Sequence, residues 1–189
     1  MCEEHWNNAV GKAVRKGRRD LFDRTVLPCL NSAYNLAHLL TRNQHDAEDI
    51  VQEAFLRALR SFDSFVPGRD GRAWLLAIVR NCFRSWLKRN RSNAATLPLN
   101  DESPAVVGTW SDPEAELIKT ANSQVIGKAL EELPLEYREI LILRELEDLS
   151  YKEIAQIIEK PLGTVMSRLS RARRELYGRL AGGTTERVI

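Results

Sequence analysis

The chain has 189 residues, a formal net charge of +2, 43% hydrophobic residues and 29% charged residues, which is typical of a globular protein and excludes general disorder. Its apolar runs are far too short to cross a bilayer, and its first residues are acidic and lack the apolar core of a signal peptide. We therefore expect a cytoplasmic protein with no direct membrane insertion.

The cysteines and histidines are scattered along the chain. Cys2, Cys29 and Cys82 are widely separated and have no histidine at ligand spacing, so we expect no disulfide framework, no metal site and no cofactor. We expect Cys29 and Cys82 to be buried thiols. No catalytic triad or phosphate-binding glycine loop can be assembled, and the sequence gives no indication of an enzyme.

Helical periodicity dominates the first half of the chain, and no alternating pattern is long enough to indicate a sheet. One or two helices are predicted up to a break at residues 41–43, with Pro28 in a first turn or at a kink. Asp46 is predicted to cap a helix that runs to about Phe62. A loop follows, and another helix is predicted from Arg72 to about residue 90.

The second half is also predicted to be helical. Residues 93–113 contain Pro, Gly and Ser without a period and are predicted to be a flexible linker. Helicity resumes near residue 114, pauses at Leu133 and Pro134, and continues to about Leu146. We predict an all-α protein of two small helical domains on a tether, with boundaries at 1–19 (tail), 20–92 (first domain), 93–113 (linker), 114–181 (second domain) and 182–189 (tail).

The second domain ends in a predicted helix-turn-helix that covers about Tyr151 to Ser170 and beyond. Ser150 and Glu153 form a capping box for the first helix, and Pro161 is expected to stop it. Thr164 is expected to cap the second helix, which turns Val165, Leu169, Ala172 and Leu176 inward. Its outer face is polar and basic, as a major-groove reader needs to be, and carries Met166, Ser167, Ser170, Arg171 and Arg174. The alternative is an ordinary helical hairpin with solvated arginines.

Charge is segregated along the chain despite the small net value. Residues 71–100 contain no acid and several arginines, and a second basic run spans 168–174. Acidic residues collect in the helix before the first basic run. Two basic faces indicate two contacts with a polyanion, and the acidic helix indicates a third surface for a basic protein partner.

Two neighbouring helices of the first domain carry candidate binding surfaces. Asp49, Gln52, Glu53 and Leu56 share one side of their helix, where a solvated stripe is the alternative. On the next helix, cations alternate with short hydrogen-bonding groups, a face that suits a phosphate backbone, and the preceding loop could hold an unstacked base. The residues concerned are Arg80, Asn81, Arg84, Ser85 and Lys88 on the helix and Phe65, Gly68 and Arg69 in the loop, although core packing is an equal alternative for Phe65.

The motifs at residues 46–59, 62–65, 72–81, 133–146, 149–155 and 163–173 together resemble the extracytoplasmic-function (ECF) sigma factors of the sigma-70 family. The resemblance covers about residues 20–180 in the right order. It implies a bacterial transcription initiation factor with sigma regions 2 and 4 only, which binds core RNA polymerase, recognises the minus-35 and minus-10 elements of promoter DNA and promotes strand opening.

The resemblance also implies roles for individual residues. Asp49, Gln52, Glu53 and Leu56 match the motif that binds the clamp helices of the largest polymerase subunit. Residues 65–71 match the loop that captures a flipped minus-10 base, with Asn81 and Ser85 beside it. Residues 164–174, which include Arg168, match the minus-35 recognition helix. Further implied partners are the flap of the second-largest polymerase subunit and an anti-sigma factor that wedges between the two domains.

Two other classes of protein remain open on the residues alone. A transcription regulator could use the helix-turn-helix without polymerase, but it would normally dimerise, and no heptad seam is present. A nucleic-acid enzyme would need carboxylates clustered for a metal near a basic surface. The cluster at Asp46, Glu48, Asp49 and Glu53 lies on a helix without basic neighbours for the nucleic acid.

Overall fold

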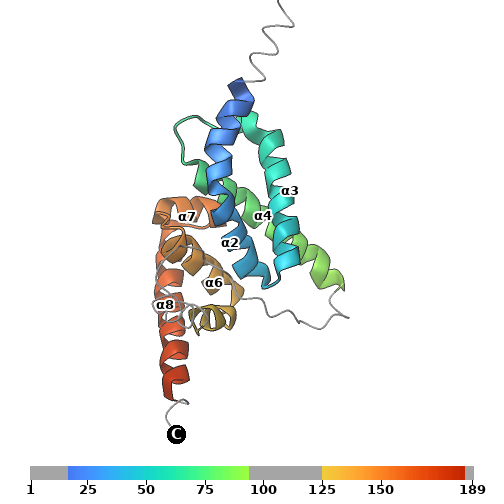
Figure 1. The fold of residues 1–189 in the computed structure, drawn as a ribbon. Helices are drawn as coiled ribbons and strands as arrows, with labels where there is room; N and C mark the ends of the chain where they lie inside the picture. The colour runs from blue at the N-terminus through green and yellow to red at the C-terminus, as the bar shows by residue number, and fades with distance from the viewer. Residues whose placement is uncertain (1–16, 94–124, 186–189) are drawn as a thin grey trace, which may run out of the picture.

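A computed structural model of the chain describes residues 17–93 and 125–185, which fold into helices joined by short turns (Figure 1). The predicted all-α architecture is confirmed. Most of the predicted linker, and the helix expected to resume near residue 114, lie outside the described residues. In chain order the elements are a helix over residues 17–26, η1 (Leu27–Cys29), α2 (Leu30–Thr41), α3 (Gln44–Ser61), η2 (Phe62–Ser64), α4 (Gly71–Asn93), a helix over residues 125–131, α6 (Leu135–Leu141), η3 (Ile142–Leu146), α7 (Tyr151–Ile158) and α8 (Leu162–Thr185).

The start of α3 differs from the prediction by three residues. Asn43, not Asp46, caps the helix, because the Asn43 side chain accepts a hydrogen bond from the Asp46 backbone N–H at 2.9 Å. Asn and Asp are equally good caps, so the sequence offers two possible caps three residues apart. The conformation of the preceding turn determines which of them is used. Here Arg42 takes a left-handed conformation with φ 59°, which ends α2 and sets Asn43 at the cap position.

A close approach fixes the start of α4. The Asp70 side chain accepts a hydrogen bond from the Arg72 backbone N–H at 2.8 Å and so caps the helix. At Gly71, a Cβ atom would lie 2.5 Å from Thr25 Cγ2 and 3.0 Å from the Thr25 carbonyl oxygen. Glycine therefore lets α4 begin directly against the end of the helix over residues 17–26.

The helix-turn-helix forms where it was predicted, but its turn differs in detail. The first helix, α7, ends at Ile158 because Glu159 adopts a left-handed conformation with φ 54°, before Pro161 is reached. The second helix, α8, begins at Leu162. Thr164 therefore lies inside the first turn of α8 and donates its backbone N–H to the Pro161 carbonyl at 2.9 Å, so the expectation that Thr164 caps this helix was wrong.

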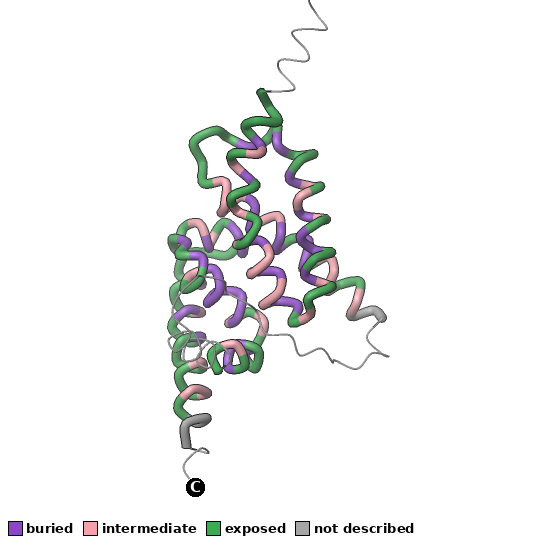
Figure 2. The backbone as a smooth tube through the Cα atoms, in the orientation of Figure 1, coloured by how far each residue is buried: buried purple, intermediate pink, exposed green. Residues whose placement is uncertain are grey.

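The two predicted domains pack directly on each other. Buried side chains of both halves form one hydrophobic core, in which α7 lies against α4 and α6 lies against α2 (Figures 1 and 2). Leu36, Leu75 and Leu76 of the first half and Ile154 and Ile158 of the second are fully buried. This contact between the halves was not predicted from the sequence, and it determines which functional side chains are exposed.

Candidate polymerase and nucleic-acid interfaces

The stripe predicted on α3 is exposed. Asp49 and Gln52 face solvent and Leu56 is 50% exposed, whereas Ile50 and Ala54 of the same helix are buried. The sequence analysis did not single out Leu59, which is also 50% exposed and lies three residues from Leu56. The three-residue spacing of Leu56 and Leu59 could have indicated from the sequence that Leu59 belongs to the stripe, because residues at this spacing share a face of the helix.

Glu53 is the half-buried member of this stripe. Its carboxylate accepts a hydrogen bond from Arg57 Nε at 2.6 Å, one turn along the helix. That hydrogen bond is the main cause of a lowered pKa for Glu53, so the carboxylate stays ionised. The α3 stripe, defined as Asp49, Gln52, Glu53, Leu56 and Leu59, thus combines anionic, amide and apolar surface.

The exposed face of α4 retains three of its five predicted residues. Asn81, Arg84 and Lys88 are exposed. Ser85 is half-buried, and its hydroxyl donates to the Asn81 carbonyl at 2.9 Å, which orients it toward its own helix. An amide and two cations are therefore exposed on this helix.

Arg80 does not lie on this face, so the prediction that it is exposed beside Asn81 was wrong. Arg80 is 3% exposed and forms an ion pair with Glu139 of α6 at 2.6 Å. Its two terminal nitrogens donate to the carbonyls of Ile157 at 2.9 Å and Ile158 at 3.4 Å, at the end of α7. The physical reason is the contact between the two halves, which covers the side of α4 that carries Arg80.

The loop before α4 is exposed except at Phe65. Phe65 is 9% exposed and lies between Phe62, with ring centroids 5.4 Å apart, and Trp74, at 5.2 Å. The core-packing alternative therefore holds for Phe65, because this aromatic cluster removes its ring from water. Gly68, with φ 90°, forms the turn that leaves Arg69 exposed.

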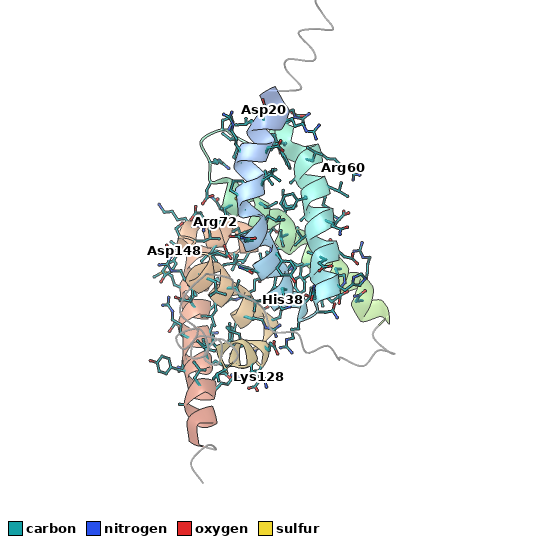
Figure 3. All side chains as sticks on the ribbon, viewed as in Figure 1. Asp20, His38, Arg60, Arg72, Lys128 and Asp148 are labelled. Atoms are coloured by element: carbon teal, nitrogen blue, oxygen red, sulfur yellow. The ribbon has the colours of Figure 1, made fainter. Side chains whose placement is uncertain are left out.

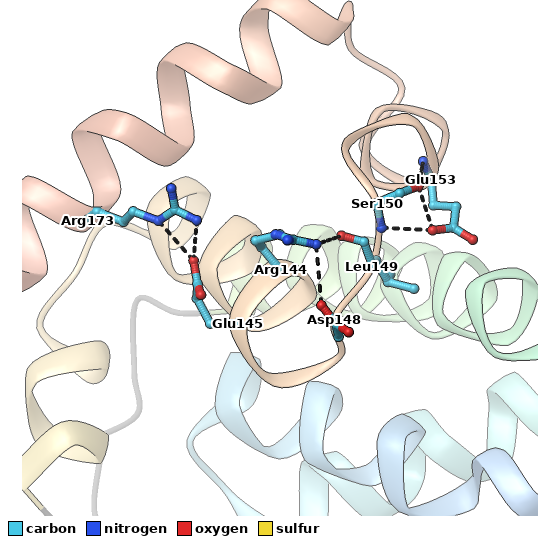
Figure 4. Close-up of polar contacts among 7 residues, drawn as sticks. All are labelled: Arg144, Glu145, Asp148, Leu149, Ser150, Glu153 and Arg173. Carbon is cyan, nitrogen blue, oxygen red and sulfur yellow. Dashed lines mark hydrogen bonds and ion pairs between the residues drawn. The ribbon is translucent and has the colours of Figure 1, made fainter.

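The second helix of the helix-turn-helix presents the face that the sequence predicted. Val165, Leu169 and Ala172 are buried and Leu176 is half-buried. The capping box at the start of α7 is also confirmed, since Ser150 and Glu153 bond reciprocally (Figure 4). The outward side chains Met166, Ser167, Ser170, Arg171 and Arg174 are all exposed.

Two arginines of the second basic run are held by acids of the same half. Arg168 is half-buried and forms an ion pair with Glu136 at 2.9 Å. Arg173 donates through two nitrogens to Glu145 at 2.9 and 2.6 Å (Figure 4). Among the described side chains, Arg171 and Arg174 make no ion pair. The positive charge on the outward face of α8 therefore comes from these two residues.

No group of three His, Cys, Asp or Glu residues within 17–93 and 125–185 is arranged to hold a metal ion. Of the helices in those ranges, none has the length and apolar character needed to cross a membrane. Cys82 is buried and Cys29 is half-buried, and desolvation raises the pKa of both thiols.

A helix-turn-helix with a basic outward helix, together with a second basic helix in the other half, defines a nucleic-acid-binding protein with two separate contacts. Comparison with known protein families agrees. Residues 26–93 match sigma-70 region 2, and residues 123–176 match sigma-70 region 4. The chain belongs to the ECF sigma factors of the sigma-70 family.

Individual relatives support this assignment. The chain is 37% identical over 169 residues to the ECF RNA polymerase sigma factor SigE of Mycolicibacterium smegmatis, covering 87% of this chain and 63% of that protein. It is 31% identical over 188 residues to the ECF RNA polymerase sigma-E factor of Haemophilus influenzae, covering 95% and 98%. Its fold is similar to the sigma factor RpoE from Bartonella quintana, solved with the anti-sigma factor NepR, with a TM-score of 0.69, 32% identity and coverage of 85% and 96%.

Proposed function

We propose that this chain directs RNA polymerase to specific promoters through three surfaces: the α3 stripe, the exposed face of α4 with its preceding loop, and the outward face of α8. The proposal is carried by one observation. Apart from the half-buried Glu53, the side chains of all three surfaces are exposed and follow the chain order of sigma regions 2 and 4, although neighbouring residues of the same helices are buried.

The α3 stripe is assigned to the clamp helices of the largest polymerase subunit. Leu56 and Leu59 supply apolar area that a partner would remove from water, and Asp49 and Gln52 supply polar contacts around it. A small apolar centre with a polar rim is the usual composition of a protein–protein contact. The second domain is assigned to the flap of the second-largest subunit by family resemblance alone.

The face of α4 is assigned to the minus-10 element. Arg84 and Lys88 lie one turn apart and suit a phosphate backbone, whereas the Asn81 amide suits a base edge. Because Phe65 is packed in the core, capture of a flipped base is assigned to the exposed loop residues around Gly68 and Arg69. Strand opening then draws its energy from binding an unstacked base.

The outward face of α8 is assigned to the minus-35 element. Arg171 and Arg174 suit phosphates or guanine, and the Ser167 and Ser170 hydroxyls can reach either backbone or base edges. Met166, which is 52% exposed, adds an apolar contact that suits a thymine methyl group. Arg168 is assigned a supporting role, since Glu136 holds its guanidinium.

An anti-sigma factor is the proposed regulatory partner, and the cytoplasm, where polymerase acts, is the proposed location. The similar RpoE structure contains an anti-sigma factor, NepR. Such a partner could block initiation by covering the α3 stripe, which is assigned to polymerase. It could also do so by covering the face of α4 or of α8, which are assigned to DNA. We assign no enzymatic activity to the chain.

Reconstituted transcription tests the proposal. The purified chain is added to sigma-free core polymerase and fragments of its source genome, and the transcript 5′ ends are mapped. We expect a defined set of start sites that share minus-35 and minus-10 elements and that are absent with core polymerase alone. Start sites indistinguishable from those of core polymerase would refute the function.

A variant separates strand opening from the other steps. Asn81→Ala should reduce transcription from duplex promoters much more than from templates that are already unpaired at the minus-10 element. Arg24→Ala, on an exposed position of the helix over residues 17–26, serves as a control for a change elsewhere in the same half. Equal losses on both templates would mean that Asn81 does not act in opening.

A further inference from the structure

Arg173 is an exposed cation of α8 that is held by an acid from another element. Its Nε and Nη2 both donate to Oε1 of Glu145, at 2.9 and 2.6 Å, and the two side chains are 47% and 48% exposed (Figure 4). These hydrogen bonds are the main cause of a raised pKa for Arg173, so the guanidinium stays charged. An exposed ion pair of this kind contributes little to the stability of the fold. Its main effect is on the charge that the surface presents.

Arg173 borders the face of α8 that is assigned to the minus-35 element. Met166, Ser170 and Arg173 follow each other at spacings of four and three residues, so they form one row along the helix. All three side chains are exposed. When Met166 and Ser170 enter the major groove, a cation in the same row lies beside the phosphates that border the groove. Arg173 is therefore suited to a phosphate contact in addition to those of Arg171 and Arg174.

The element that carries Glu145 is fixed in place by its neighbours. Glu145 belongs to η3, a π-helical turn, and such turns are frequent at functional sites. The adjacent Arg144 donates to the Leu149 carbonyl at 2.8 Å, and its Cζ lies 5.4 Å from the centre of the Tyr151 ring at the start of α7. Figure 3 shows Asp148, which follows η3, at the edge of the second half that faces away from α3. Glu145 is thus held next to α8 on an open side of the molecule.

Other paired arginines of α8 are turned away from the DNA-facing row. Arg168 pairs with Glu136 of α6 at 2.9 Å, and Arg179 lies 3.7 Å from Glu132. Both arginines are half-buried against the rest of the second half. Among the arginines of α8, all of which the structure describes, Arg173 is the one that is exposed and also neutralised by an acid.

We propose that Glu145 sets the sequence-independent DNA affinity of α8 by keeping Arg173 from the phosphate backbone. The inference rests on the proposed function of the outward face of α8 and adds to it a residue outside that helix. The pair brings no net positive charge to the DNA, and the carboxylate repels a phosphate that approaches the guanidinium. A larger share of the binding energy then comes from base contacts, and the chain is held less by the many non-specific sites of a genome.

Release of Arg173 should add one phosphate contact. Each such contact multiplies the binding constant by about the molar salt concentration to the power −0.9, through the release of counterions. One more contact is therefore worth about eightfold at 0.1 M salt and about fourfold at 0.2 M salt. Because a phosphate contact is made with every sequence alike, the ratio of affinities for two sequences should not change.

Glu145→Gln tests this in the full chain, because glutamine keeps the size and an acceptor oxygen of glutamate but removes its charge. Glu175→Gln is the matched control. It deletes the same charge from an ion pair with Arg179 at 2.7 Å, where Glu175 is 47% exposed, and it leaves Arg179 beside Glu132. The double variant Glu145→Gln/Arg173→Ala shows whether a gain in affinity acts through Arg173. Circular dichroism establishes that the variants keep the helical content of the wild type.

The first readout is the binding of a fluorescent 30-base-pair mixed-sequence duplex by anisotropy between 0.1 and 0.3 M salt, without polymerase. Glu145→Gln should bind about eightfold more tightly than the wild type at 0.1 M salt, with a salt slope steeper by about one. Glu175→Gln and the double variant should stay close to the wild type, since neither adds a phosphate contact. The second readout uses polymerase and compares a mapped promoter with a copy whose minus-35 element is scrambled. The ratio of the two affinities should be the same for Glu145→Gln and the wild type.

The outcomes separate this inference from the proposed function. Wild-type affinity and slope in Glu145→Gln would overturn it, and so would a lower affinity, which would mean that the pair supports the DNA-binding form of α8. An equal gain in Glu175→Gln, or a gain that persists in the double variant, would show an effect of net charge and not of Arg173. A changed affinity ratio would mean that Glu145 contacts a base and would also overturn the inference. Failure of the reconstituted transcription with the wild-type chain would refute the proposed function and leave the mixed-sequence measurement unaffected.

Discussion

Removal of the two leucines from the α3 stripe should weaken polymerase binding without weakening the fold. Leu56 and Leu59 are each 50% exposed in the free chain, so polymerase could bury about half of each side chain. Full burial of a leucine is worth about 1.5–3 kcal/mol, and half of that for two residues gives about 1.5–3 kcal/mol in total. The double variant Leu56→Ala/Leu59→Ala should therefore bind core polymerase about 10- to 150-fold more weakly.

The assay is a competition in which the unlabelled variant displaces a fluorescent wild-type chain from core polymerase. Leu27→Ala is the matched control, because Leu27 is 52% exposed but lies in η1, outside the stripe. It should retain wild-type affinity. Unchanged affinity of the double variant, or an equal loss in Leu27→Ala, would refute the assignment of the stripe to polymerase.

Three further predictions concern DNA binding and stability. Arg171→Ala should lower affinity for duplex DNA and reduce its salt slope by about one, while Arg173→Ala should change the slope less because Glu145 already pairs with it; equal slopes would contradict this. Ser150→Ala removes the capping box and should cost about 1 kcal/mol, a fall of about 2–4 °C in melting temperature; an unchanged transition would argue against the cap. Burial lowers the pKa of His38 in the folded chain, so the unfolded chain binds the proton more readily and the free energy of unfolding should fall as the pH drops below about 6.5. Urea titrations at pH 7.5 and 5.5 should show a smaller fall in His38→Gln than in the wild type, and an equal fall would reject the role of His38.

Local features of the fold could be predicted from the sequence because each depends on residues close along the chain. The capping box needs only Ser150 and Glu153, and the inward set of α8 follows from the helical period, as the burial of Val165 and Leu169 confirms. The exposed stripe on α3 was predictable for the same reason. These features follow from spacings of three and four residues.

Features that depend on distant residues could not be predicted. Arg80 was placed on an exposed face because its own helix permits it, but its partner Glu139 is 59 positions away. For Phe65 the sequence permits either a role in base binding or packing in the core. The structure shows that Phe65 packs in the core, in an aromatic cluster with Trp74. The sequence signal that could have indicated a packed interface is the adjacent Arg138 and Glu139 in the otherwise largely apolar α6. Both residues are buried, and charged residues are rarely buried without partners.

The identification of two DNA-binding surfaces is tested most directly by hydroxyl-radical footprinting on one promoter mapped by the reconstituted transcription. With core polymerase, the wild-type chain should protect both the minus-35 and the minus-10 elements. Arg171→Ala should lose protection at the minus-35 element alone, and the chain without polymerase should protect neither. A single uninterrupted footprint from the free chain, or loss of both elements in Arg171→Ala, would contradict the account.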